Sequence, residues 1–267
     1  MNDSRTSSTD IRLVDTHCHL DDPSFDEDLD AVLQASREAG VTSWIMVGFS
    51  PERWDAAIRM AHEIDGLAHM LGVHPANAQE WNADTSARLV HLLESSHARA
   101  VGEIGLDFYR DNAPYEVQHR AFIDQLRIAR DLGLPAVFHM RDAEDEMLKI
   151  LESESDLPRM VFHSFDGSER LPRFILDRDA IIGVGGLATR QKSGQLREQL
   201  CHIPLRSMVI ETDSPWLIPA RQKTRRNTPA QVRTIATFLA DHLGCTLQDV
   251  ARETTATAES VFGRLLP

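Results

Sequence analysis

The chain has 267 residues, 42% of them hydrophobic, and a formal net charge of −13 at pH 7. This length and composition predict one domain with a large buried core. The acidic charge argues against tight, non-specific binding of nucleic acid through bulk charge, but it is compatible with a local basic patch or a metal site.

The first ten residues are polar and rich in Ser and Thr, without the apolar segment of a signal peptide. They predict a disordered tail (residues 1–10) before one folded domain (residues 11–267). No apolar run is long enough to cross a membrane. Cys18, Cys201 and Cys245 show no C-x-x-C spacing, which favours reduced thiols and a cytoplasmic location.

Short apolar runs recur along the whole chain, with the continuous hydrophobic character of buried parallel strands. The predicted strands are residues 12–17, 42–48, 68–74, 100–104, 135–139, 159–163, 180–184 and 207–211. Helical periodicity between them is clearest in residues 25–39, ending at Gly40, and residues 118–132, ending at Gly133. Helices are also expected to begin near Pro51, Pro114 and Pro229.

Strand and helix alternate without a break in composition, which predicts the α/β class and a single TIM-type (β/α)8 barrel. A doubly wound open sheet is the alternative, but no G-x-G-x-x-G follows the first run.

The first run ends in Asp15-Thr16-His17-Cys18-His19. Because side chains two apart in a strand point to the same side, His17 and His19 aim two imidazoles at one point, which is half of a metal site. An H-x-H pair alone is a weak signal. It gains weight because further candidate ligands end other runs, namely His74, Glu103, His139, His163 and Asp213.

Barrel enzymes assemble their sites at the carboxyl ends of the strands, so these residues are expected to converge. Each has an ordinary structural alternative, since a lone strand-end histidine is often a hydrogen-bonded structural residue and Asp213 also suits a turn before Pro215. Glu103 lies in an apolar segment, where a carboxylate is unexpected unless it is paired or metal-bound. The other histidines are interpreted as surface or packing residues: His62, His69, His91, His97, His119, His202 and His242.

Four imidazoles and two carboxylates can hold two divalent cations with open positions for water. None of the lysines (Lys149, Lys192 and Lys223) ends a predicted strand, so Glu103 is the natural bridging ligand in place of a carboxylated lysine. Two neighbouring cations suit in-line displacement at phosphorus. Their identity stays open among Mg²⁺, Mn²⁺ and Zn²⁺, because Mg²⁺ prefers oxygen ligands and imidazoles suit Mn²⁺ or Zn²⁺ better.

Taken together, these motifs resemble the TatD-related deoxyribonucleases, a family of amidohydrolase-like barrels. The matching segments follow the family's order at residues 14–20, 72–75, 102–107, 138–143, 163–168 and 211–217. The resemblance implies metal-dependent hydrolysis of phosphodiester bonds in DNA, either endonucleolytic or from the 3′ end toward the 5′ end.

The resemblance also implies roles for individual residues. One metal ion would be held by His17, His19 and Asp213, the other by His139 and His163, and Glu103 would bridge them. Asp213 would accept the proton of the attacking water, and His74 would face the substrate phosphate. Arg141 is a candidate phosphate clamp, although an exposed structural ion pair explains it equally well. The expected catalytic residues are therefore Asp213, Glu103 and His74.

The substrate is less clearly indicated than the chemistry. Asp166 adds negative charge near the expected entrance, whereas Arg221-Gln222-Lys223-Thr224-Arg225-Arg226 is a basic stretch on the catalytic face that either guides a phosphate backbone or is simply solvated. Trp216 either stacks on bases or walls the pocket.

The leading hypothesis is a two-metal phosphodiesterase in which metal-activated water attacks phosphorus in single-stranded DNA or at 3′ ends. The alternative is a hydrolase of a small ester, lactone, amide or phosphoester. The sequence indicates neither membrane association nor an obligate protein partner.

Overall fold

The computed structural model describes residues 11–110 and 112–265, so the predicted tail lies outside the described residues. Parallel strands form one eight-stranded sheet, in which they follow one another in chain order. The strands are β1 (Leu13–Cys18), β2 (Val41–Gly48), β3 (Leu67–Leu71), β4 (Val101–Asp107), β5 (Ala136–Arg141), β6 (Met160–Phe162), β7 (Ile181–Val184) and β8 (Met208–Ile210).

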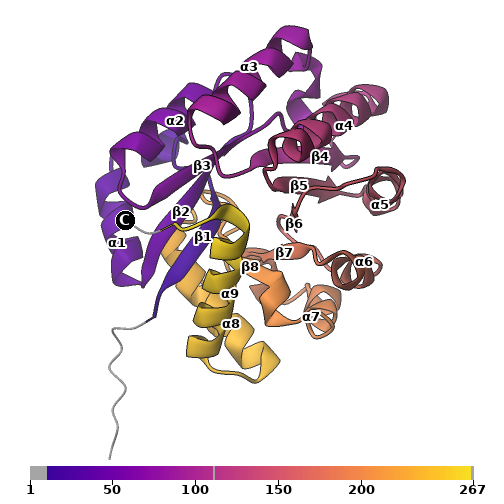
Figure 1. The fold of residues 1–267 in the computed structure, drawn as a ribbon. Coiled ribbons are helices and arrows are strands. Elements are labelled where there is room, and N and C mark those ends of the chain that lie inside the picture. The colour runs from indigo at the N-terminus through magenta and orange to yellow at the C-terminus, as the bar shows by residue number, and fades with distance from the viewer. Residues whose placement is uncertain (1–10, 111, 266–267) are drawn as a thin grey trace, which may run out of the picture.

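Helices surround the strands (Figure 1). They are α1 (Leu29–Glu38), α2 (Trp54–Glu63), α3 (Ala83–Ser95), α4 (Tyr115–Leu132), α5 (Glu144–Ser153), α6 (Leu171–Arg178), α7 (Gly194–Leu200), α8 (Val232–Leu243) and α9 (Leu247–Phe262). Short 3-10 helices are η1 (Pro23–Phe25), η2 (Pro75–Glu80), η3 (Gly186–Thr189), η4 (Leu205–Ser207) and η5 (Pro229–Gln231).

The sheet closes between β1 and the segment after β8. Cys18 bridges Ser214 in parallel fashion. The backbone N–H of Asp213 donates to the carbonyl of His17 at 2.9 Å, and the N–H of His19 donates to the carbonyl of Ser214 at 2.8 Å. The α/β barrel prediction is therefore confirmed, and the open doubly wound sheet is excluded.

The predicted helix over residues 25–39 was wrong in its first turn. Asp22 accepts a hydrogen bond from the N–H of Ser24 and caps η1, so the α-helix begins only at Leu29. The helix predicted over residues 118–132 begins three residues earlier, at Tyr115, directly after Pro114. β3 ends at Leu71, before His74, and β4 continues to Asp107.

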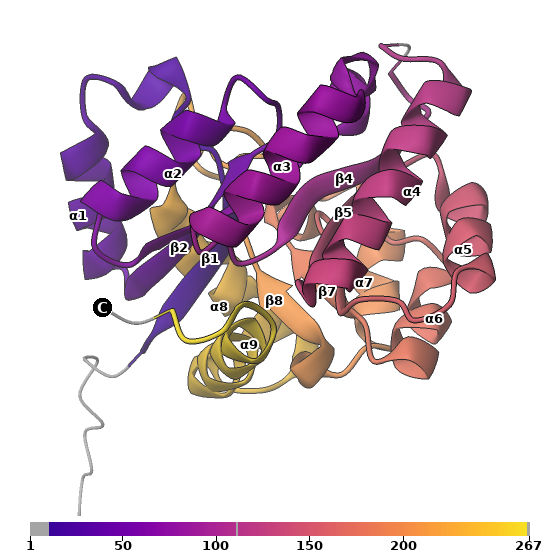
Figure 2. The same ribbon diagram turned by 45° about the horizontal axis from the view of Figure 1, so that its top comes forward.

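Apolar side chains fill the amino-terminal end of the barrel. Val14, Ile45 and Val137 belong to a buried cluster to which α9 contributes Val261 and Phe262. Figure 2 shows α9 lying beside β1 and β8. This end of the barrel is therefore closed by the C-terminal helix, which leaves the opposite end for a site.

Within the described residues, no helix combines the length and hydrophobicity needed to cross a membrane. Cys18, Cys201 and Cys245 are free thiols, in agreement with the cysteine spacing.

Candidate active site and metal centre

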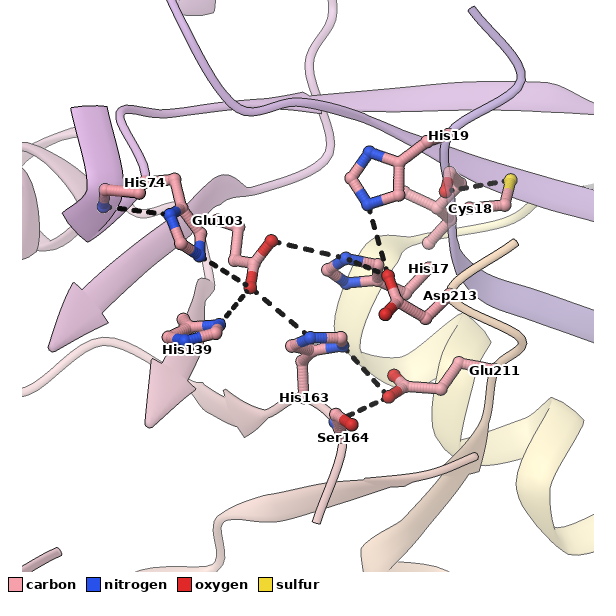
Figure 3. A network of polar contacts seen from close by, with 12 residues as sticks. His17, Cys18, His19, His74, Glu103, His139, His163, Ser164, Glu211 and Asp213 are labelled. Carbon is pink, nitrogen blue, oxygen red and sulfur yellow. Dashed lines mark hydrogen bonds and ion pairs between the residues drawn. The ribbon is translucent and has the colours of Figure 1, made fainter. Parts of the chain in front are cut away.

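The Glu103 carboxylate lies at the centre of a group of histidines at the carboxyl ends of the strands (Figure 3). Its Oε1 is 2.7 Å from Nδ1 of His139, 3.3 Å from Nε2 of His163 and 3.7 Å from Nε2 of His74. Its Oε2 is 3.4 Å from Nε2 of His17. Glu103 thus faces four imidazoles from four different strand ends, as the strand-end pattern predicted.

Irregular pairing in two strands helps to aim these ligands. The β1–β2 register shifts between Asp15 and Cys18, around His17, and the β4–β5 register shifts between Gly102 and Ile104, around Glu103. An extra residue in a strand changes which face its neighbours occupy. In a regular strand, His17 would point to the opposite face from Val14, and Glu103 to the opposite face from Gly102. The register shifts allow the buried side chains of His17 and Glu103 to point into the barrel.

A second group of ligands lies beside the first. Nε2 of His19 is 3.3 Å and Nε2 of His17 is 3.7 Å from Oδ1 of Asp213. Asp213 has a φ of 55°, in the left-handed region that aspartate tolerates better than most residues. The structure thus brings together His17, His19 and Asp213 on one side of Glu103, and His139 and His163 on the other.

Hydrogen bonding inside the protein does not satisfy this site. Among the described residues, both ring nitrogens of His17 and Nδ1 of His19 are buried without a hydrogen-bond partner. Buried polar atoms are normally paired, and an unpaired one costs stability. Ligand atoms of His17, His19 and Asp213, and likewise those of Glu103, His139 and His163, all lie within 4.8 Å of one another. This donor set fits divalent cations.

Two further carboxylates, Glu211 and Asp107, belong to the site and were not among the predicted site residues. Oε1 of Glu211 is 3.0 Å from Nδ1 of His163, and Oδ2 of Asp107 is 3.1 Å from Nε2 of His139. A carboxylate on the far nitrogen of an imidazole fixes the ring and its tautomer. Both residues end apolar segments, which was the signal available in the sequence.

Glu103 and Asp213 stay ionised despite burial. Burial alone would raise the pKa of Glu103, but the imidazoles of His163, His74, His139 and His17 hold it well below its usual value. For Asp213, burial likewise opposes ionisation, and the hydrogen bond to His19 with the nearby His163 and His17 lowers the pKa below the ordinary one. The site therefore offers negative charge to a cation.

Two histidines differ sharply in their protonation. For His163, burial would lower the pKa, but Glu211 and Glu103 outweigh it and raise the pKa to about 10. For His74, burial lowers the pKa to about 3. Because Nδ1 of His74 accepts a hydrogen bond from the N–H of Ala76 at 3.0 Å, its proton is on Nε2, the nitrogen that faces Glu103.

His74 and His163 line a cleft of about 910 Å³. The predicted substrate residues Arg141 and Trp216 line its wall. The guanidinium of Arg141 lies 3.7 Å from the centroid of the Tyr109 ring. The centroids of the Trp216 and His19 rings are 4.9 Å apart. Arg110 and Arg190 also line the cleft. No ion pair joins these three arginines to a carboxylate within the described chain, whereas Arg127 on the outer surface is paired with Glu154.

A sequence profile described as TatD related DNase matches residues 14–263. The chain belongs to this family. The chain is 33% identical over 257 residues to a protein of Escherichia coli named 3′-5′ ssDNA/RNA exonuclease TatD, covering 94% of this chain and 99% of the relative. It is 30% identical over 251 residues to YabD of Bacillus subtilis, named an uncharacterized metal-dependent hydrolase, covering 94% and 98%.

The TatD fold is also seen in solved structures similar to this chain. The crystal structure of YJJV, a TatD homologue from Escherichia coli, superposes with a TM-score of 0.89 at 29% identity, covering 95% of this chain and 99% of that one. A TatD family hydrolase of Entamoeba histolytica superposes with a TM-score of 0.84 at 23% identity and supports the fold alone. This chain is thus a TatD-family metal-dependent hydrolase with the family's barrel.

Proposed function

We propose that this chain is a two-metal phosphodiesterase that shortens single-stranded DNA or RNA from the 3′ end. The observation that carries the proposal is the Glu103 carboxylate facing four imidazoles, beside a second group formed by His17, His19 and Asp213. The substrate class is supported by the printed name of the TatD relatives, 3′-5′ ssDNA/RNA exonuclease.

Six residues would hold the two cations: His17, His19 and Asp213 on one side, His139 and His163 on the other, and Glu103 between them. Bound divalent cations supply positive charge that stabilises phosphate oxygens and favours the hydroxide form of water. Glu211 and Asp107 would hold the rings of His163 and His139 in place.

Asp213 is suited to accept the proton of the attacking water. Its carboxylate is ionised, its side chain is 17% exposed, and it lines the cleft. A positioned carboxylate of this kind contributes as a general base. His17, which is wholly buried, has no comparable access to solvent.

His74 and Arg141 are suited to hold the phosphate. His74 lines the cleft, is neutral and carries its proton on Nε2, so it can donate a hydrogen bond without adding charge. Arg141 keeps its guanidinium at the wall of the cleft through its contact with Tyr109. A guanidinium can donate two parallel hydrogen bonds to a phosphate.

The test uses single-stranded DNA and RNA oligonucleotides labelled at either end, with added Mg²⁺, Mn²⁺ or Zn²⁺. We expect stepwise shortening from the 3′ end by the wild-type protein and none by Glu103→Gln. Glu116→Gln, at an exposed position of α4, is the matched control and retains activity. Absence of cleavage from metal-loaded protein would refute the nuclease assignment.

A second candidate is a hydrolase of a small ester or phosphoester, and one observation favours it. Asp142 and Asp166 line the same cleft and repel a polyanionic chain more than a small substrate. The two candidates differ in salt dependence, because binding of a phosphate backbone weakens steeply with salt and binding of a small substrate does not.

A further inference from the structure

The loop after β8, which follows the catalytic residue Asp213 in the chain, gathers exposed basic side chains. Arg221, Lys223 and Arg225 are all exposed in this loop. No ion pair joins any of the three to a carboxylate within the part of the chain that the structure describes, although the chain carries a net charge of −13. Their charges are therefore available to a ligand in an otherwise acidic protein.

The loop is anchored at both ends, first to η3 and then to the segment that carries Asp213. Before it, the N–H of Ala220 donates to Oγ1 of Thr189 at 2.7 Å. After it, Asn227 donates from its backbone N–H to the carbonyl of Pro215 at 2.9 Å and from Nδ2 to the carbonyl of Thr212 at 2.8 Å. The Asn227 end of the loop is therefore held beside the segment that carries Asp213.

Arg226 differs from its three basic neighbours. Its Nη2 donates to both carboxylate oxygens of Asp28, and its guanidinium lies 4.6 Å from the centroid of the Phe25 ring. Oγ1 of Thr224 donates to the carbonyl of Arg226 at 2.8 Å, which ties the turn together. Arg226 thus fixes the loop to the segment after β1 and leaves the other three cations facing solvent.

Another part of the ring is acidic. Asp142, Glu144, Asp145 and Asp166 line a hollow of about 440 Å³ formed by residues after β5 and β6. In the closed ring β5 and β6 lie three and two positions from β8, which precedes the basic loop. A chain of phosphates leaving the cleft is therefore repelled by the side at β5 and β6 and attracted by the loop after β8. Trp216, which also follows β8, is 47% exposed at the cleft wall.

We propose that Arg221, Lys223 and Arg225, with Trp216 at the edge of the cleft, form a binding surface for the part of a single-stranded nucleic acid that lies outside the catalytic cleft. The inference rests on the proposed nuclease function and identifies which surface holds the rest of the substrate. Cationic side chains next to an exposed aromatic ring are the usual composition of a single-strand binding surface.

The test compares two triple substitutions that remove the same charge. The first is Arg221→Gln, Lys223→Gln and Arg225→Gln. The second is Lys149→Gln, Arg173→Gln and Arg178→Gln, at exposed positions of α5 and α6. Each triple is placed in a Glu103→Gln background for binding, so that no oligonucleotide is consumed, and in the wild-type background for cleavage. Fluorescence anisotropy of labelled oligothymidylates with Mn²⁺ present then gives the affinity at several salt concentrations.

For an oligonucleotide of about 15 nucleotides, we expect the loop triple to raise Kd about tenfold or more and to reduce the slope of log K against log salt by about 2. The α5–α6 triple is expected to change neither. For a trinucleotide, which ends within the cleft, Kd and the cleavage rate are expected to stay unchanged in both triples. In the wild-type background, the loop triple should raise KM for the long substrate alone.

Equal salt slopes in the two triples, with the long substrate still cleaved, would overturn this inference and leave the proposed function standing. If the wild-type protein neither binds nor cleaves oligonucleotides with any metal, both fail. A loss of trinucleotide cleavage in the loop triple would also count against the inference, because the loop would then act on the catalytic residues instead of on distant phosphates.

Discussion

The two ends of the barrel are built from the same strands and have opposite chemistry. At the amino end, Val14 and Ile45 pack against Phe262 of α9 in a wholly apolar cluster. At the carboxyl end, Glu103 faces imidazoles, and both ring nitrogens of His17 are buried without a partner among the described residues. The amino end is thus dominated by apolar packing, whereas the carboxyl end presents buried polar atoms to a ligand.

This difference shows that the two ends of the barrel contribute differently to stability and to activity. Burial of apolar surface stabilises the amino end at about 25 cal/mol per Å². The carboxyl end concentrates buried ionisable groups, which reduce stability unless something neutralises them. Changes at the carboxyl end should therefore act mainly on activity, and changes at the amino end should act mainly on stability.

The largest effect is expected at the carboxyl end. Asp213→Asn removes the proton acceptor and should lower kcat/KM for an oligonucleotide by about 10²–10⁴-fold, the usual contribution of a general base. The melting temperature without metal should fall rather than rise, because the lowered pKa of Asp213 shows that the folded state favours its ionised carboxylate.

A kcat/KM within tenfold of the wild-type value would assign the proton transfer elsewhere. Asp241→Asn, at an exposed position of α8, is the matched control and should change neither activity nor melting temperature.

At the amino end, Phe262→Ala should lower the free energy of unfolding by about 3–5 kcal/mol, because it opens a cavity where the 3%-exposed ring of Phe262 packs. Denaturant unfolding measures the loss, and oligonucleotide cleavage at a temperature where the variant is folded should be unchanged. Phe262→Leu should cost much less, since it retains most of the volume. Lost catalysis in folded Phe262→Ala would show that the two ends are coupled.

The sequence was sufficient for the barrel and for the convergence of the candidate ligands, because runs of apolar residues report buried parallel strands and polar strand-end residues interrupt them. The sequence was not sufficient to predict the strand register or which carboxylate contacts which histidine. The register shifts around His17 and Glu103 depend on contacts with neighbouring strands, and no local pattern shows them. Asp107 and Glu211 were not predicted as site residues for the same reason, because their role depends on the histidine ring that each one contacts.

Metal ions should stabilise the protein through the carboxyl end alone. At a concentration a hundred times Kd, a bound ion should add about 2.7 kcal/mol to the free energy of unfolding, and a chelator should remove it. Thermal melts with Mn²⁺ or Zn²⁺ against chelator measure the shift. Phe262→Ala should keep the full shift and His19→Ala should lose much of it. An equal shift in both variants would place metal binding outside the proposed site.

The smallest effect concerns His69 in β3, a buried histidine that belongs to neither end. Its Nε2 lies 2.9 Å from Oγ of Ser96, so unlike His17 it has a partner inside the protein. Burial, with a smaller contribution from nearby His62, Arg99 and His97, lowers its pKa from 6.5 to about 4.

Between these two pH values the unfolded chain binds a proton at His69 that the folded chain does not, so this residue's contribution to stability is complete above pH 6.5 and falls as the pH drops toward 4. We expect about 2 kcal/mol to be lost over that window. His69→Gln should reduce the pH dependence of the free energy of unfolding, measured with chelator present so that metal binding does not contribute. The difference between the variant and the wild type then separates His69 from the histidines of the catalytic end, which are the same in both. An unchanged slope would mean that the buried His69 ring is accessible to protons in the folded state, and that the histidines of the catalytic end alone set the acid sensitivity of the protein.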